Sequence, residues 1–210
     1  MSHTAIIAAE IKSMESLRKA CKKLGYKFVK DQKSYRWFRK FMGDYPLPDG
    51  MTVNDLGKCE HAIKIPGANY EIGVIKDPMN KDNYKLIWDF WDHSLPQIVG
   101  QNAWKLTQAY TIEQAKHSAR LNGHLFRIER KEDRERMIID MGGEKQIIMD
   151  VINSTGETKI ETKGYIGMKC VEESKFLKDA LGKTIETDLL PIAHMKENGQ
   201  QQRLYRPICG

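Results

Sequence analysis

Apolar residues recur at helical spacing in two stretches of the chain. In the first, a stripe within residues 17–24 lies between Ser13 and Gly25. A serine hydroxyl accepts hydrogen bonds from the unpaired N–H groups of a first helical turn, and glycine commonly follows the last helical residue. The second stretch, residues 95–122, has the longest stripe of this kind. We therefore expect two helices, with Cys21 as a core thiol inside the first.

Short apolar runs and alternating patterns predict the strands. Residues 4–11 form an apolar run that is typical of a buried strand, whereas residues 84–91 alternate apolar and polar side chains. The polar residues 76–83 predict the turn of a hairpin, and the dense charges of residues 130–136 predict a solvated turn in a second one. We expect strands over residues 4–11, 62–65, 70–75, 84–91, 124–129, 137–141, 146–152 and 157–163.

Gly142 and Gly143 mark the domain boundary that the sequence favours, because the strand pattern starts again after them. We predict an α+β fold. Residues 1–142 are expected to form an antiparallel sheet with two helices on one face, in a ferredoxin-like or split βαβ arrangement. Residues 143–187 are expected to form a small ββα accessory unit, which needs another surface to complete its core. Residues 188–210 lack periodicity and are expected to form an extended tail.

The composition is that of a globular protein with a basic balance. Of 210 residues, 40% are hydrophobic and 30% are charged, and the formal net charge is +6. A positive balance favours anionic small molecules, nucleic acid or acidic protein surfaces as partners. The four cysteines form no Cys-x-x-Cys pair, no signal-peptide pattern is present, and no apolar run reaches the roughly 20 residues that span a bilayer. We expect a cytoplasmic protein with reduced cysteines and no membrane partner. The sequence leaves open whether it forms a homo-oligomer.

Aromatic and cationic residues interleave between Tyr26 and Lys40. Cations neutralise phosphate while rings stack on bases, so this mixture is typical of nucleic-acid binding. A strand whose rings face the core and whose cations face water has the same composition. The sequence leaves both interpretations open. Under the first, Arg36 and Lys40 are candidate ligand-binding residues.

The sequence contains no recognisable catalytic motif. A Walker loop, Gly-x-Ser-x-Gly, His-Glu-x-x-His and a zinc-binding quartet are all absent. Cys59 and His61 are spaced as two metal ligands can be, but no third or fourth ligand accompanies them. We therefore predict no metal and no cofactor, and we favour a binding protein over an enzyme.

Residues 158–182 form the best-defined local pattern, which is a strand, a glycine-punctuated turn and a helix that begins near Cys170. The unpaired N–H groups of a first helical turn stabilise negative charge, which favours phosphate binding or a cysteine of lowered pKa. Glu172 and Glu173 already complement the helix dipole, however, which favours the interpretation of Cys170 as a buried structural residue. The candidate ligand-binding residues of this pattern are Lys163, Gly164, Gly167, Lys169 and Cys170.

Three segments carry a family likeness: Tyr70–Val74, Asn83–Asp89, and Leu106–Tyr110 with the Lys-, Ser- and Ala-containing stretch that follows to Gly123. Together they resemble the small protein encoded by hypothetical plastid open reading frame thirty-five, with its bacterial and phage relatives. The resemblance covers about residues 1–141 and rests on the order of the elements. Residues 26–66 depart from the compact family pattern.

A second and more specific likeness covers Ile147–Gly182, which resembles a small uncharacterised bacterial domain often encoded beside the first family. Bacterial relatives of both are encoded near MoxR-type AAA+ ATPases and von Willebrand factor A proteins, in gene sets suspected of acting in phage conflict. The resemblance implies that the chain is a fusion of two families and that it acts in phage conflict. It implies no particular chemistry. The matching positions are Glu161, Thr162, Gly164, Gly167, Cys170, Leu177, Leu181 and Gly182.

The charge, the glycine-flanked helix start and the implied context together predict a non-enzymatic binding protein for an anionic, phosphate-bearing ligand of the nucleotide type. If phage-encoded, such a protein would sequester an immune messenger in the host cytoplasm. Two alternatives stay open. One is an adaptor that docks on an AAA+ ATPase or a defence protein, and the other is a nucleic-acid binder that uses residues 26–40.

Overall fold

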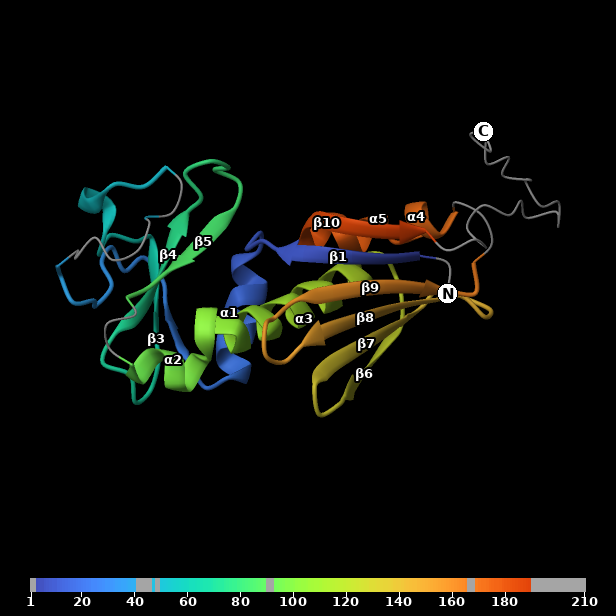
Figure 1. The fold of residues 1–210 in the computed structure, drawn as a ribbon, viewed down its shortest axis with the longest axis horizontal. Helices are drawn as coiled ribbons and strands as arrows, with labels where there is room; N and C mark the ends of the chain where they lie inside the picture. The colour runs from blue at the N-terminus through green and yellow to red at the C-terminus, as the bar shows by residue number, and fades with distance from the viewer. Residues whose placement is uncertain (1–2, 41–46, 48–49, 90–92, 166–168, 190–210) are drawn as a thin grey trace, which may run out of the picture.

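The protein folds into two antiparallel sheets with helices packed against them (Figure 1). The computed structural model describes residues 3–40, 47, 50–89, 93–165 and 169–189. The predicted α+β class is confirmed. The larger sheet has six strands, in the spatial order β10 (Gly182–Leu189), β1 (His3–Ala9), β9 (Thr158–Lys163), β8 (Gln146–Ile152), β7 (Arg134–Asp140) and β6 (Phe126–Arg130). The smaller sheet has the order β2 (Lys27–Val29), β3 (His61–Lys64), β4 (Glu71–Lys76) and β5 (Tyr84–Ile87).

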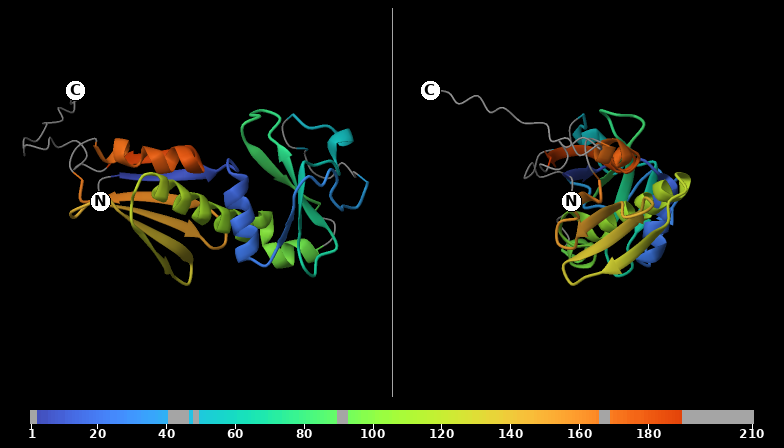
Figure 2. Two further views of the ribbon diagram at one scale, coloured as in Figure 1. Left: turned by 180° about the vertical axis from the view of Figure 1, so that it is seen from behind. Right: turned by 90° about the vertical axis from the view of Figure 1, so that its right-hand side faces the viewer.

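Helices α3 (Trp104–Leu121) and α5 (Lys175–Leu181) cover one face of the six-stranded sheet (Figure 2). Side chains alternate between the two faces of a strand, so every second residue of β7 and β8 points toward these helices. In the register, Met137 lies opposite Met149, and Ile139 lies opposite Ile147. All four are fully buried, together with Ile112, Ala115 and Ala119 of α3 and Leu177 and Leu181 of α5.

The predicted boundary at Gly142 and Gly143 is a turn inside the six-stranded sheet. Both glycines have positive φ, and Lys145 N–H donates to the Gly142 carbonyl at 3.2 Å. Strand β8 pairs with β7 along its whole length, and β9 pairs with β1. Residues 143–187 are therefore part of the main sheet and not a separate ββα unit. The expected tail also begins inside strand β10, and residues 190–210 lie outside the described part of the chain.

The smaller sheet contains the strands expected near residues 62–65, 70–75 and 84–91, with β4 and β5 joined as the predicted hairpin. Its inner face packs on α1 (Met14–Lys23) and α2 (Ser94–Val99). Helix α1 begins as predicted, since Ser16 N–H donates to the Ser13 hydroxyl oxygen at 3.2 Å. The shared core contains Leu17, Cys21, Ile63, Ile72, Val74, Leu95 and Leu106, all buried.

The single helix expected over residues 95–122 is broken. Helix α2 ends at Val99, a short 3₁₀ turn covers Gln101–Ala103, and α3 follows. Gly100, Asn102 and Ala103 all have positive φ. A side chain at Gly100 would overlap the Trp104 ring, so glycine is required where the chain turns. No helix in the described ranges is long and apolar enough to cross a bilayer.

Helix α3 connects the two sheets. Its first half, with Leu106 and Tyr110, is buried in the core of the smaller sheet, whereas its second half belongs to the core of the larger one. The Tyr110 hydroxyl accepts hydrogen bonds from the N–H groups of Lys12 (2.8 Å) and Ser13 (3.3 Å). Because those residues lie between β1 and α1, this contact fixes the place where the chain passes from one sheet to the other.

Candidate anion-binding cleft

The segment after β2 folds back over the outer face of the smaller sheet. Tyr35 is buried there, and its N–H donates to the Gly57 carbonyl at 3.0 Å. Its ring lies over Gly73 of β4, where an added Cβ would come within 2.6 Å of the ring. The Trp37 ring in the same way occupies the space that a side chain at Gly57 would need. Two glycines therefore let this segment lie close to the sheet.

Glu71 anchors the segment. Its side chain is 2% exposed, and one carboxylate oxygen accepts hydrogen bonds from the backbone N–H of Arg36 and the side-chain amide of Gln32, each at 2.9 Å. The other oxygen accepts from Arg36 Nε at 3.2 Å and lies 3.7 Å from Lys64 Nζ. The Glu71 N–H donates back to the Arg36 carbonyl. A buried carboxylate needs such partners, so the segment and the strand hold each other in place.

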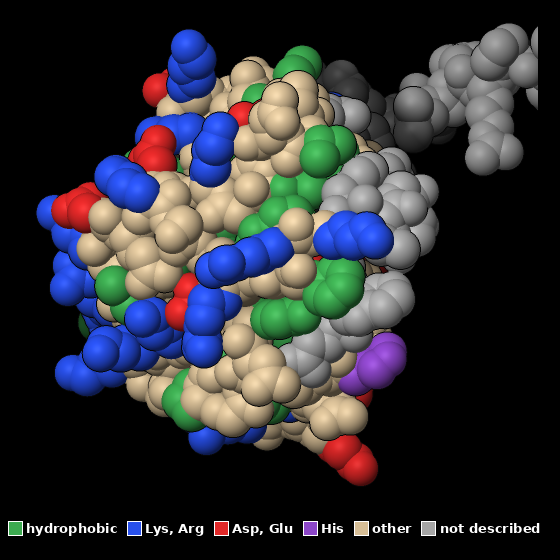
Figure 3. Space-filling view, turned by 90° about the vertical axis from the view of Figure 1, so that its left-hand side faces the viewer, with side chains coloured by type: hydrophobic (Ala, Val, Ile, Leu, Met, Phe, Trp, Pro, Cys, Tyr) green, Lys and Arg blue, Asp and Glu red, His purple; other side chains and the backbone are tan. Residues whose placement is uncertain are grey.

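An open cleft of about 760 Å³ lies between this segment and the sheet. Four cations and one carboxylate line it, so the cleft has an excess of positive charge. The Arg36 side chain is 63% exposed although its backbone is fixed. Figure 3 views this end of the molecule, where Lys and Arg side chains gather along one side. The lining residues are Gln32, Ser34, Tyr35, Arg36, Trp37, Arg39, Leu56, Gly57, Lys58, Lys64 and Glu71.

Of the two cationic candidates near the N-terminus, Arg36 lines this cleft. Lys40 is exposed and is not among the lining residues, although its neighbour in the sequence, Arg39, is. Only Lys27–Val29 of the interleaved stretch forms a strand, and the remainder is a loop held on the sheet. The strand interpretation therefore applies to a small part of residues 26–40.

The C-terminal candidates lie elsewhere. Helix α4 (Lys169–Glu173) is at the opposite end of the molecule from the smaller sheet (Figure 1). Cys170 is 0% exposed and packs with Tyr165, so an anion in solvent does not reach its thiol. Gly164 has a φ of 80°, and a side chain there would overlap the Glu144 carbonyl, which is a structural reason for glycine. Lys163 and Lys169 are exposed, and Gly167 lies outside the described residues.

The structure thus separates the predicted site residues into two groups, one around Arg36 and one around Cys170. It adds residues that the sequence did not single out, chiefly Lys58, Lys64 and Glu71. Of these three, only Glu71 could have been singled out from the sequence, because it is a charged residue inside a run that otherwise has the pattern of a buried strand.

Cys59 and His61 each bind other groups of the protein. The Cys59 thiol donates to the Gln32 carbonyl at 3.0 Å, and burial raises its pKa to about 11. His61 Nδ1 accepts the Asp31 N–H at 3.0 Å, and its ring packs against Phe28. Within the described ranges, no group of three or more His, Cys, Asp or Glu side chains is placed to hold a metal ion.

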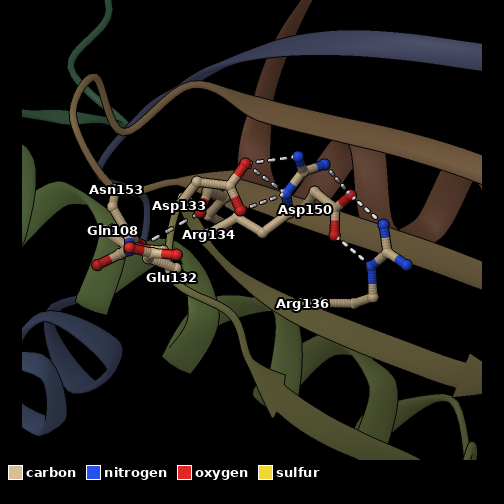
Figure 4. A network of polar contacts seen from close by, with 8 residues as sticks. Gln108, Glu132, Asp133, Arg134, Arg136, Asp150 and Asn153 are labelled. Carbon is tan, nitrogen blue, oxygen red and sulfur yellow. Dashed lines mark hydrogen bonds and ion pairs between the residues drawn. The ribbon is translucent and has the colours of Figure 1, made fainter.

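A second polar network lies on the six-stranded sheet (Figure 4). Asp150 accepts hydrogen bonds from Arg136 at 2.6 Å on both carboxylate oxygens and from Arg134 at 3.2 Å. Burial by itself raises the pKa of Asp150, but the hydrogen bonds from Arg136 and Arg134 outweigh it, and the pKa lies below its usual value. Arg134 also pairs with Asp133 at 2.6 Å, so two carboxylates balance the two arginines, and the bonds from Arg134 and Arg136 to Asp150 join β7 to β8.

Comparison with known proteins gives one match. Residues 149–192 match the family described as "Protein of unknown function (DUF2997)". The matched residues include β9, α4, α5 and β10, so they overlap the small-domain likeness seen in the sequence and do not include the cleft. No curated protein and no solved structure matched the chain.

Proposed function

We propose that this protein is a non-enzymatic binding protein for a phosphate-bearing ligand of the nucleotide type, held in the cleft around Arg36. The observation that supports it is the convergence of Arg36, Arg39, Lys58 and Lys64 on one open cavity. Its volume falls within the range of small-molecule sites, roughly 300–1,000 Å³.

The charge and geometry suit phosphate. A guanidinium group matches two phosphate oxygens with parallel N–H donors, and lysines add mobile positive charge around it. The Arg36 backbone is bound to buried Glu71, so little conformational freedom has to be lost there when a ligand binds. Trp37 and Tyr35 give the cleft an aromatic wall that suits a base or another flat group.

The same residues argue for binding without catalysis. Among the described lining residues there is no histidine or cysteine, and the only carboxylate, Glu71, already accepts hydrogen bonds from Arg36 and Gln32. A general base has to be able to take up a proton from its substrate, and this carboxylate faces donors that are already in place. In the conflict setting that the resemblance implies, the protein would withdraw a nucleotide-type signal from solution in the host cytoplasm.

The test is isothermal titration with a panel of linear and cyclic nucleotides. We expect binding by at least one of them, weakened about 10-fold to 100-fold in Arg36→Ala, since a charge-assisted hydrogen bond contributes about 1.5–3 kcal/mol. Arg127→Ala is the matched control, because Arg127 is an exposed arginine on β6 paired with Glu129, away from the cleft. The absence of heat with every nucleotide at near-millimolar concentration would overturn the proposal. A native mass spectrum reports co-purified nucleotide and subunit number together.

A further inference from the structure

A second basic cavity lies beside the first, on the α1 side of strand β2. It encloses about 610 Å³, and we call it the α1 cavity. Arg18, Lys19 and Lys22 from α1 provide its charge, and all three are exposed. The half-buried rings of Tyr26 and Phe28 form its apolar part. Like the cleft around Arg36, it therefore combines cations with aromatic rings.

The α1 cavity also has an excess of positive charge. Its one carboxylate, Glu15, is bound by Lys19 at 2.6 Å, one helical turn away. The hydrogen bond from Lys19 lowers the pKa of Glu15, so this carboxylate is ionised and paired at neutral pH. Arg18 and Lys22 remain as exposed cations on the same helix. An anionic chain that lies along α1 would therefore contact Arg18 and Lys22.

The polypeptide itself limits the distance between the two sites. Phe28 lines the α1 cavity, and Gln32, four residues later, lines the cleft. Four residues of extended chain span at most about 14 Å. The connecting residues 29–31 begin in β2, which is an edge strand, and within them the exposed Lys30 lies 3.8 Å from the Asp31 carboxylate. The exposed Lys27 and Lys33 lie on either side of the gap, so cations flank it while the cation inside it is paired.

We infer that the natural ligand is a single-stranded nucleic acid that occupies the cleft and the α1 cavity together and passes over the edge of β2. This inference rests on the proposed binding of a phosphate-bearing ligand in the cleft, and it extends that ligand from one nucleotide to a strand of nucleotides. A nucleic-acid strand carries one phosphate per about 3.4 Å when stacked and is more extended when its bases are unstacked, so at most about four nucleotides bridge the gap. Single-strand binding sites combine such a cationic track with rings on which bases stack.

The rings distinguish a single strand from a duplex. Tyr26 and Phe28 lie on the α1 side of β2, and Trp37 belongs to the cleft, so each cavity has at least one ring. Bases reach aromatic side chains only when they are not stacked and paired in a duplex. A mononucleotide would contact only one of the two cavities.

The test compares labelled single strands of twelve thymidines or twelve uridines with a mononucleotide, a duplex and an inorganic polyphosphate of equal charge. Wild-type protein is compared with the double variant Arg18→Ala, Lys22→Ala and with the control Arg127→Ala. We expect the variant to bind the twelve-residue strands at least about 10-fold more weakly and to bind the mononucleotide unchanged. Because each cation lost lowers the salt dependence for a single strand by about 0.7, the slope of log K against log salt should fall by about 1.4.

The outcomes separate this inference from the proposed function. If a mononucleotide binds and the longer strands bind no tighter, the inference is overturned and the proposed function stands. Binding of polyphosphate as tight as that of the strands would also overturn it, because the rings would then contribute nothing. If no ligand binds, both proposals fail. Tighter binding than that of the mononucleotide, the duplex and the polyphosphate by either of the two strands supports the inference.

Discussion

Glu71 accepts hydrogen bonds from both the backbone N–H and the guanidinium of Arg36, so a buried residue fixes an exposed one. Removing the carboxylate in Glu71→Ala leaves these donors without their acceptor. We expect a loss of about 2 kcal/mol in the free energy of unfolding, less than the 3–5 of a fully buried ion pair because the Arg36 side chain is largely in water. Urea unfolding measures it.

Glu129→Ala is the control for that change. Glu129 pairs with Arg127 at the surface, and an exposed pair of this kind contributes about 0.2–1 kcal/mol. A loss in Glu71→Ala no larger than in the control would mean that the carboxylate does not anchor the Arg36 segment.

Gly73 and Tyr35 are expected to be coupled. A Cβ at position 73 would lie 2.6 Å from the Tyr35 ring, so Gly73→Ala has to displace that ring, at a cost of about 1–3 kcal/mol. In a Tyr35→Ala background most of this cost should disappear, because the obstructing ring is absent. Urea unfolding of the two single variants and the double variant gives the coupling energy. Additive losses would contradict the packing described for this pair.

Asp150 makes stability depend on pH at the acidic end. Its pKa is lower in the folded protein than in the unfolded chain, so its contribution is present above about pH 4 and is lost as the pH falls through the folded-state pKa. We expect Asp150→Asn to be less stable than wild type between about pH 5 and pH 7, and the difference to shrink below about pH 4. Urea unfolding at several pH values measures it, with Asp82→Asn on an exposed turn as the control. A difference that does not vary with pH would exclude this linkage.

The described cysteines should be unreactive in the folded protein. Burial raises the pKa of Cys21 to about 12 and that of Cys59 to about 11, and Cys170 is fully buried. Because the thiolate is the nucleophile, alkylation at about pH 8 should be slower than in urea by about 100-fold or more at Cys21 and Cys59. Mass spectrometry of iodoacetamide adducts locates each modification. Rapid labelling of native Cys21 would contradict the burial.

Cys170→Ala tests whether the C-terminal pattern takes part in binding. We expect the free energy of unfolding to fall by about 1 kcal/mol, as for other small reductions of a buried side chain, with nucleotide affinity unchanged within twofold. Titration of the variant beside Arg36→Ala measures both candidate regions. A loss of affinity in Cys170→Ala alone would move the site to the end of the molecule that contains α4.

Local patterns predicted eight of the strands but missed β10 and placed the first residues of β7 in a turn, and they predicted the assembly poorly. The alternation of apolar and polar side chains along β7, β8 and β9 involves residues that are neighbours in the chain, so it is visible in the sequence. The division into two sheets depends on which strands pair, and β1 pairs with β9 and β10, which lie far away in the chain. A pair of glycines such as Gly142 and Gly143 is equally typical of a turn within a sheet and of a boundary between domains. Composition therefore does not distinguish these two interpretations.

The candidate site was predictable in the same limited way. The mixture of rings and cations around Arg36 was visible because its members are neighbours in the sequence. Lys58 and Lys64 come from other segments, and only the folding of the Arg36 loop onto the sheet brings them to it. The helix start near Cys170 was recognised correctly, but whether its thiol faces solvent is decided by packing against Tyr165.

The position of β1 constrains the order in which the protein is built. His3 is paired with Thr162 on one side and with Leu189 on the other, so β1 is synthesised long before the two strands that pair with it. On the ribosome, α1 and the smaller sheet can assemble from residues that emerge early, while β1 stays unpaired until residues 158–189 have left the exit tunnel. We expect arrested chains that stop before residue 158 to be cut by protease within β1, and full-length chains to be protected there.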